Sequence, residues 1–310
     1  MTDLPVRITA RRDEATAVFA LELAAVDGGE LPSWSPGAHI DVAVGDLGVR
    51  QYSLCGDPAD RRRWRIAILR EPDGRGGSDL LHHTAHPDSE LRVSLPRNNF
   101  ELKAEDRYLF VAGGIGITPI LPMVAAAARS GTPWELYYGA RTRQHMAFAD
   151  EIGKCYPKAK LVAQDVDGLL PLTAILDERA DATVYCCGPE PLLDAVETTG
   201  AQRGITVRTE RFVPRAVDTT ADRAFDIELA RDGRTLRVGA RQSIVDVLES
   251  AGVSVVTSCR EGTCGSCETL VVAGEIEHRD SILTDEERAR GETIMLCVSR
   301  AGSDRLVLDL

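Results

Sequence analysis

Four cysteines near one end of the chain constrain its fold more than any other feature of the sequence. Three follow the spacing C-x4-C-x2-C and the fourth stands alone further on: Cys259, Cys264, Cys267 and Cys297. Three thiolates from one tight loop and a fourth from an adjacent strand can converge on a small anionic core. This is the plant-type arrangement for a two-iron, two-sulfur (2Fe-2S) cluster, and the spacing predicts these cysteines as its metal ligands.

A structural zinc site is the alternative for such a group of thiols. Four-cysteine zinc sites usually pair one C-x2-C with a second close pair, whereas Cys297 has no close partner, so the iron–sulfur interpretation is favoured. Gly262 and Gly265 are expected to give the loop unusual backbone angles and to let backbone N–H groups approach the sulfurs. Ser258 and Ser266 are candidates for hydroxyl hydrogen bonds to them.

The sequence predicts a multidomain protein, since 310 residues exceed the usual length of one domain. Residues 1–102 contain short alternating strands separated by Gly/Pro turns, which indicates an antiparallel β-barrel or sandwich. In residues 103–212 strands alternate with helices, the pattern of an α/β domain with a parallel sheet. Residues 213–224 are polar and aperiodic, as in a linker. Residues 225–310 begin with a hairpin at Asp232–Gly233 and a helix that Ser243 can cap.

Charge and hydropathy narrow the classes of partner. The net charge of −12 disfavours nucleic acid as a partner, because phosphates need Lys and Arg, and it provides no basic patch for a membrane surface. No apolar run approaches the roughly 18 residues of a membrane span. The first residues lack the apolar core of a signal peptide, so a cytoplasmic location is expected.

A glycine-rich turn in the second domain resembles a phosphate-binding loop. In RYLFVAGGIGITPI, Gly114 and Gly116 leave room for a phosphate, Thr118 is the expected N-cap of the next helix, and its N-terminus attracts a pyrophosphate. Pro119 breaks the G-x-G-x-x-G pattern, so a plain βα connection is the alternative. The segment from Cys187 to Pro189 ends another strand of the same sheet, and ligands of open α/β sheets bind at such strand ends.

Two segments of the first domain form a second candidate site. In RQYSL, alternation places Arg50 and Tyr52 on one face of a strand and Ser53 on the other. In GRGGS, the residues that offer backbone N–H groups and a helix cap to a phosphate are Arg75, Gly76, Gly77 and Ser78. Taken alone, these segments are equally typical of surface packing and a flexible loop.

Together, these motifs resemble the phthalate dioxygenase reductase family. The resemblance runs over nearly the whole chain and includes RQYSL (50–54), GRGGS (74–78), SLPRNNF (94–100), AGGIGITPI (112–120), YCCGPEPLLDAV (185–196), CREGTCGSC (259–267) and MLCVSRA (295–301). It implies an FMN-binding β-barrel, an NADH-binding α/β domain and a C-terminal α+β ferredoxin domain of the β-grasp type. Members of the family serve Rieske-type aromatic oxygenases, so a terminal oxygenase is the expected partner.

The resemblance also implies roles for single residues. Arg50 pairs with the FMN phosphate, Tyr52 packs on the flavin, and Ser53 hydrogen-bonds near its reactive nitrogen; Ser53 and Cys187 are the catalytic candidates. Arg75, Gly76, Gly77 and Ser78 complete the flavin site. The nucleotide contacts are Gly114, Gly116 and Thr118 at the pyrophosphate, and Cys187, Gly188 and Pro189 beside the nicotinamide. Phe212 is the candidate aromatic beside the flavin.

Three alternatives stay open at the level of the sequence. Arg141 and Arg143 follow the second strand of the α/β domain and could accommodate a 2′-phosphate, so NADPH is an alternative to NADH. A cytochrome P450 or another haem protein could replace the Rieske-type oxygenase as electron acceptor. A zinc-stabilised module fused to a nucleotide-sensing domain is the alternative from outside the enzymes.

Overall fold

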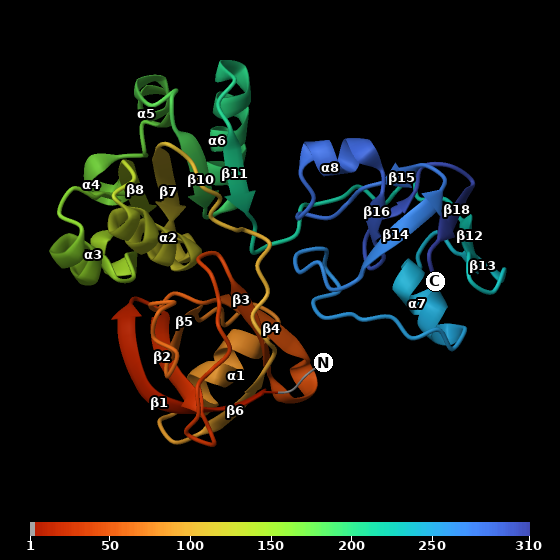
Figure 1. Ribbon diagram of the computed structural model, residues 1–310, viewed down its shortest axis with the longest axis horizontal. Coiled ribbons are helices and arrows are strands. Elements are labelled where there is room, and N and C mark those ends of the chain that lie inside the picture. Colours follow the sequence, from red (N-terminus) through yellow and green to blue (C-terminus); the bar gives the residue numbers. More distant parts are fainter. Residues whose placement is uncertain (1–3) are drawn as a thin grey trace. The chain divides into compact units, whose positions relative to one another are not determined.

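The structure is a computed structural model that describes residues 4–310. The chain divides into two compact units, Met1–Glu210 and Arg211–Leu310, each with its own sheets and its own hydrophobic core (Figure 1). No helix within residues 4–310 combines the length and the apolar character needed to cross a membrane.

The first unit begins with an antiparallel barrel, which decides between the predicted barrel and sandwich. Its strands run in the order β4-β3-β6-β1-β2-β5. A bridge between Leu54, just after β4, and Ile66 of β5 joins the two edges. The elements are β1 (Leu4–Ala15), β2 (Val18–Ala25), β3 (His39–Ala43), η1 (Gly45–Leu47), β4 (Val49–Ser53), β5 (Trp64–Leu69), α1 (Gly77–Thr84) and β6 (Glu90–Val93). Inward-facing side chains such as Ile8, Leu21 and Ile40 fill the barrel.

The same unit continues into the predicted parallel sheet, with strand order β11-β10-β7-β8-β9. Its elements are β7 (Tyr108–Gly113), η2 (Gly114–Gly116), α2 (Ile117–Ser130), β8 (Trp134–Ala140), η3 (Arg143–His145), α3 (Ala149–Cys155), β9 (Lys160–Ala163), α4 (Gln164–Asp167), α5 (Leu172–Glu178), β10 (Thr183–Cys187), α6 (Glu190–Arg203) and β11 (Val207–Glu210). The chain leaves β7 toward β8 and later returns to β10 on the other side of β7. The ends of β7 and β10 therefore flank the switch point, where such sheets bind ligands.

The barrel and the parallel sheet share one hydrophobic core. Ala67 and Cys55 of the barrel belong to the same buried cluster as Ile117 and Phe148 of the α/β domain. A shared core resists relative movement of the two domains, because interiors are densely packed.

The second unit has the β-grasp architecture, a mixed five-stranded sheet with strand order β13-β12-β18-β14-β16. Its elements are β12 (Phe225–Leu229), β13 (Thr235–Val238), α7 (Ile244–Ser250), β14 (Glu268–Ala273), β15 (Ile276–Glu277), α8 (Asp285–Arg290), β16 (Thr293–Met295), β17 (Arg300–Ala301) and β18 (Arg305–Leu308). The predicted turn is present, with Gly233 at φ +72°. The predicted cap is present too, since the Ser243 hydroxyl accepts from the Asp246 N–H.

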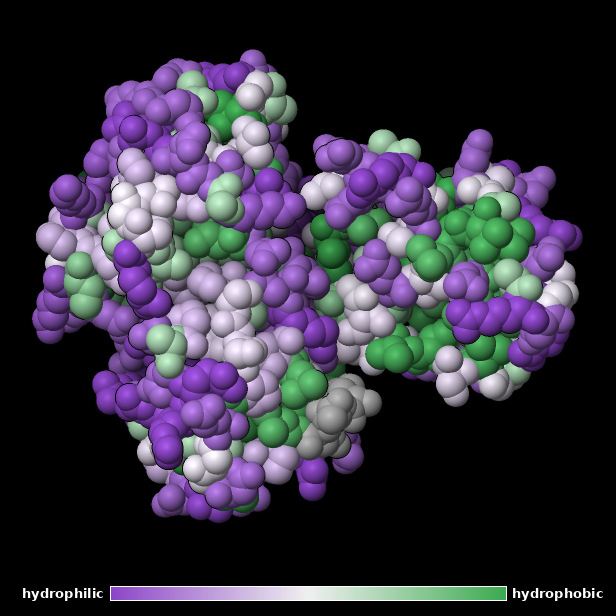
Figure 2. Space-filling model, viewed as in Figure 1, coloured by the Kyte–Doolittle hydropathy of each residue, from purple (hydrophilic) through white to green (hydrophobic). Residues whose placement is uncertain are grey.

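Strand β14 carries exposed apolar side chains on its outer face. Val271 packs against the core, whereas its neighbours Leu270 and Val272 are 55% and 63% exposed. Figure 2 shows hydrophobic atoms gathered over this part of the second unit. The alternation of a strand explains the arrangement, because successive side chains point to opposite faces.

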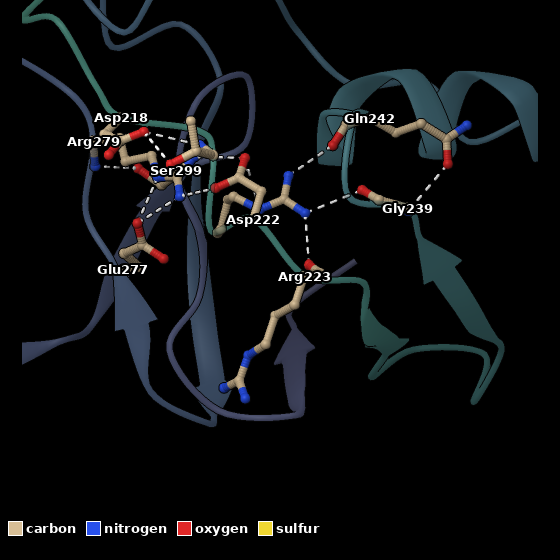
Figure 3. Close-up of polar contacts among 10 residues, drawn as sticks. Asp218, Asp222, Arg223, Gly239, Gln242, Glu277, Arg279 and Ser299 are labelled. Carbon is tan, nitrogen blue, oxygen red and sulfur yellow. Dashed lines mark hydrogen bonds and ion pairs between the residues drawn. The ribbon is translucent and has the colours of Figure 1, made fainter.

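The polar segment before β12 is fastened to the second unit by buried ion pairs. Both Asp222 carboxylate oxygens accept hydrogen bonds from Arg279, at 2.5 and 3.1 Å (Figure 3). Arg300 lies 3.7 Å from the same carboxylate and donates to the carbonyls of Arg223 and Gly239. The side chains of Asp222, Arg279 and Arg300 are less than 10% exposed, so this part of the segment is structurally defined.

Candidate functional site

The flavin candidates of β4 meet the start of α1. The Arg50 guanidinium donates to the carbonyls of Leu47, Val49 and Arg75. These bonds use three of its five N–H groups, which leaves two for an anion. A Cβ on Gly77 would lie 2.5 Å from Nε of Arg50, so glycine is needed there for the arginine to lie against the helix start. The residues present therefore fit a phosphate.

The cap of α1 differs from the prediction. Gly76, with φ +76°, is the N-cap, and Ser78 lies inside the first turn of the helix. The Ser78 hydroxyl instead accepts a hydrogen bond from the backbone N–H of Glu71. Ser78 was wrongly predicted as the cap, because a left-handed glycine can begin the helix two residues earlier and leave the serine to fix the preceding loop.

Tyr52 and Ser53 lie on opposite faces of β4, as alternation requires. Tyr52 packs beside the barrel core, and desolvation raises the pKa of its hydroxyl, so it stays neutral. Ser53 is 4% exposed at the end of the same strand. Because a buried hydroxyl needs a hydrogen-bond partner, this position suits a polar atom of a ligand.

The two glycine-containing turns of the α/β domain contact each other at the switch point. A Cβ on Gly116 would lie 2.3 Å from the Cys187 carbonyl oxygen, and one on Gly188 would lie 3.0 Å from Gly113 Cα. Gly114, at φ +53°, faces open space instead. Glycines thus bring the turns together and leave an uncovered backbone where a pyrophosphate can approach.

Thr118 is not the N-cap of α2, contrary to the prediction. The segment Gly114–Gly116 forms a short 3₁₀ helix, Gly116 is the N-cap of α2, and Thr118 lies in the first helical turn. Its side chain is 2% exposed and donates to the Ile115 carbonyl. The Thr118 hydroxyl therefore stabilises the 3₁₀ turn from the first turn of α2, because the 3₁₀ turn continues directly into that helix.

Cys187 is fully buried at the end of β10, opposite Glu210 of β11. Burial, together with the Glu210 charge, raises the pKa of its thiol well above the usual range, so it remains protonated. Glu210 is partly exposed as a residue, but its Oε2 is shielded from solvent and has no hydrogen-bond partner among residues 4–310. Desolvation raises the pKa of this carboxyl to about 8.

Glu210 is a candidate site residue that the sequence patterns did not reveal. The available signal is its position at the carboxyl end of a parallel strand beside the Cys187 strand, where a charged residue is unexpected unless it has a role at the site. Phe212 lies just beyond the first unit, with its side chain 42% exposed. Its predicted place beside the flavin stays a prediction.

The four cysteines of the second unit come together. Contacts link Cys259 with Cys264 and Cys297, and Cys267 with Cys297; hydrogen bonding from Cys264 and Cys297 lowers the pKa of the Cys259 thiol. Four thiols gathered in this way can hold a 2Fe-2S core, in which each iron takes two of them.

The cluster loop has the expected backbone. Gly262 and Gly265 have φ +73° and +72°. The N–H groups of Glu261 and Ser266 donate to the sulfurs of Cys259 and Cys264, at 3.3 and 3.4 Å. Such donors stabilise the negative charge of a bound cluster.

Comparison with known proteins agrees with this geometry. Residues 227–302 match the family model of the 2Fe-2S iron-sulfur cluster binding domain, and residues 110–198 match that of the oxidoreductase NAD-binding domain. A phthalate dioxygenase reductase of Burkholderia cepacia is 38% identical over 316 residues, covering 99% of this chain and 97% of that protein. The chain belongs to the phthalate dioxygenase reductase family. A vanillate O-demethylase oxidoreductase of Pseudomonas putida is 40% identical and covers 98% of both chains.

Solved structures support membership of the phthalate dioxygenase reductase family. Phthalate dioxygenase reductase itself, described as modular for electron transfer from pyridine nucleotides to a 2Fe-2S centre, matches at 37% identity with a TM-score of 0.71, covering 100% and 98% of the two chains. An intact type IV self-sufficient cytochrome P450 monooxygenase matches at 38% identity with a TM-score of 0.93. The match covers 99% of this chain but only 41% of that longer protein. The predicted family, three-domain fold, NAD domain and 2Fe-2S domain are confirmed, and the zinc alternative is wrong.

Proposed function

We propose that this chain is the reductase component of an oxygenase system, which takes a hydride from NADH on FMN and delivers single electrons through its 2Fe-2S domain to a Rieske-type oxygenase. One observation carries the proposal: a barrel, an NAD domain and a 2Fe-2S domain occur in one chain that aligns end to end with reductases named for phthalate dioxygenase and vanillate O-demethylase. The oxygenase would be a ring dioxygenase or an O-demethylase.

The chemistry of the three cofactors sets the order in which electrons pass between them. NADH gives two electrons as one hydride, an iron–sulfur cluster accepts one electron at a time, and a flavin placed between them supplies both kinds of chemistry. Plant-type clusters lie near about −400 mV and Rieske centres at about −150 mV or above. The gap of roughly 250 mV corresponds to about four powers of ten in the equilibrium constant, so delivery is downhill.

The described residues have definite tasks in this proposal. Arg50 and the N–H groups at the start of α1 hold the FMN phosphate, and Ser53 offers its hydroxyl to the flavin ring. Gly114, Gly116 and the start of α2 bind the pyrophosphate of the nucleotide. Holding the nicotinamide and the flavin in the correct orientation is the main contribution of the protein to the rate of hydride transfer, and no acid–base triad is required.

Charges near the end of β8 favour NADH over NADPH. Arg143 is paired with Asp150 at 3.3 Å, and the backbone N–H of Asp165 donates to the Arg141 carbonyl. Arg143 is thus already paired with a carboxylate, which weakens its attraction for the 2′-phosphate of NADPH.

A cytochrome P450 is the second candidate acceptor. It is favoured by the match of almost the whole chain to part of the self-sufficient P450 monooxygenase. In that case a haem domain takes the place of the Rieske-type partner.

A cytoplasmic location is part of the proposal. NADH is supplied in that compartment, and none of the eight cysteines, all of which lie within residues 4–310, forms a disulfide, as expected in a reducing environment.

Cofactor analysis and reconstitution test the proposal. Purified protein should contain FMN together with iron and acid-labile sulfide in equal amounts, and NADH should bleach its visible spectrum. Mixed with candidate Rieske-type oxygenases and P450s, it should support product formation by the former. FAD in place of FMN, zinc in place of iron, or turnover with P450s alone would contradict it.

A further inference from the structure

Arg65 of β5 contacts both the barrel and the α/β domain. Its Nη1 and Nη2 atoms donate to the two carboxylate oxygens of Glu151 on α3, at 2.7 and 3.0 Å. The same guanidinium donates to the carbonyl of Cys55, at 2.8 Å from Nη2 and 3.2 Å from Nε. One side chain therefore joins a strand end of the barrel to a helix of the α/β domain.

The surroundings strengthen this contact. The Arg65 side chain is 23% exposed, and its guanidinium lies 4.7 Å from the centre of the Phe148 ring. Phe148 is buried and has φ +58°, a conformation that costs a non-glycine residue about 1 kcal/mol or more. A forked, partly buried arginine–carboxylate pair is stronger and more directional than an exposed one.

The contact reaches the residues of the proposed site. Cys55 follows Ser53 by two positions, and its backbone N–H donates to the Arg65 carbonyl at 2.8 Å. Its thiol lies in the same core as Ile117, which directly follows the nucleotide turn. Arg65 thus connects the segment that presents Ser53 with the domain that carries the nucleotide turn.

We propose that Arg65 is a positioning residue for hydride transfer, which acts with Glu151 to fix the flavin segment relative to the nucleotide turn. The inference rests on the proposed function. Hydride transfer needs the reacting atoms within a near-attack distance, and a misplacement of about 1 Å can cost on the order of a hundredfold in rate.

Glu151→Gln is the primary test, because it keeps the shape of the side chain and removes the charge. We expect the limiting rate of anaerobic flavin bleaching by NADH to fall by about tenfold. FMN content and the dissociation constant of NADH should stay near those of the wild type. Amide hydrogen exchange at residues 54–56 should become faster in the same variant.

Asp57→Asn is the matched control. Asp57 of the barrel pairs with Arg129 of α2 at 3.0 Å and so also joins the two domains, but both side chains are more than half exposed. Exposed pairs contribute little, so this variant should reduce flavin within about twofold of the wild-type rate. Arg65→Lys keeps the charge but loses the two-pronged hydrogen bonding of the guanidinium. Its rate of flavin bleaching by NADH should lie between those of the wild type and Glu151→Gln.

The outcomes separate the two proposals. A slow Glu151→Gln variant with normal cofactor and NADH binding, beside a normal control, supports the inference. A wild-type bleaching rate in both Glu151→Gln and Arg65→Lys overturns it and leaves the proposed function intact. Failure of NADH to bleach the wild-type protein overturns both.

Discussion

Cys187 at the end of β10 lies directly opposite Glu210 at the end of β11 in parallel register. A protonated thiol and a shielded carboxyl are thus adjacent at the switch point of the nucleotide-binding sheet. Burial raises the pKa of both groups, so near neutral pH this edge of the sheet carries less negative charge than its composition indicates. That favours the approach of an anionic dinucleotide.

The carboxyl of Glu210 should make stability depend on pH. Its pKa is about 8 in the folded protein, against 4.5 for the free group. Between these values the folded state holds a proton that the unfolded state lacks, so stability falls as pH rises, by at most about 1.4 kcal/mol per unit. We expect Glu210→Gln to remove this slope. As pH rises from 5.5 to 8.5, the melting temperature of the wild type should fall relative to that of the variant; parallel curves would contradict the assignment.

Sequence patterns predict the parts of this site that local spacing determines. The cysteine loop was predicted because its ligands and glycines lie within a few residues of one another. The predicted N-caps Ser78 and Thr118 were wrong because a glycine holds the N-cap position of each helix, in a left-handed conformation before α1 and at the end of a 3₁₀ turn before α2. A search for Ser or Thr at N-cap positions does not reveal such helix starts.

Contacts between distant residues are beyond such patterns. Arg65 and Glu151 are 86 positions apart, and each alone resembles an ordinary surface charge. Glu210 ends β11, a strand in which every residue is partly exposed. The strand therefore shows no alternation of buried and exposed residues from which the shielding of Glu210 could be predicted. β6 has only Val93 buried, which is too little to predict a strand.

Arg50→Glu should release FMN. The substitution places a negative charge against the phosphate and removes a charge-assisted hydrogen bond worth about 1.5–3 kcal/mol, so affinity should fall at least about tenfold. Iron and sulfide content should be unchanged, because the cluster ligands lie in the other unit. Arg62→Glu, at an exposed position of the barrel, is the control. Wild-type flavin occupancy in Arg50→Glu would show that another residue binds the phosphate.

Gly262→Ala should lower the occupancy of the 2Fe-2S cluster. The new Cβ would lie 2.7 Å from Val298 Cγ2 and 3.1 Å from Asp280 Cα, in addition to the strain of a positive φ. Gly291→Ala has similar strain at φ +62° but meets nothing within 4 Å, so it separates the clash from the strain. Iron per chain and visible circular dichroism measure the outcome; equal losses in the two variants would assign the effect to strain alone.

Asp222→Asn should destabilise the second unit. It leaves Arg279 and Arg300 without their shared carboxylate in a site less than 10% exposed, at a cost of about 2 kcal/mol. Hydrogen bonding from Arg279 lowers the pKa of Asp222, so its contribution is present above the unfolded pKa and is lost as pH falls below it. Thermal loss of the cluster spectrum measures the effect. Asp304→Asn, whose side chain is 99% exposed beside Arg223, should change nothing.

Truncation and salt should reveal where electrons leave the protein. Residues 225–310 carry ten Lys/Arg against sixteen Asp/Glu, half of the chain's net charge, so a positive patch on the oxygenase should steer docking to this domain. A chain ending at Ala224 should still bind FMN and reduce ferricyanide, but should fail to reduce cytochrome c efficiently or to support the oxygenase. In the intact enzyme, partner-linked turnover should fall as salt shortens the Debye length below about 10 Å, whereas ferricyanide reduction should not follow that dependence. Comparable oxygenase turnover by the truncated chain would show that electrons leave from the flavin instead.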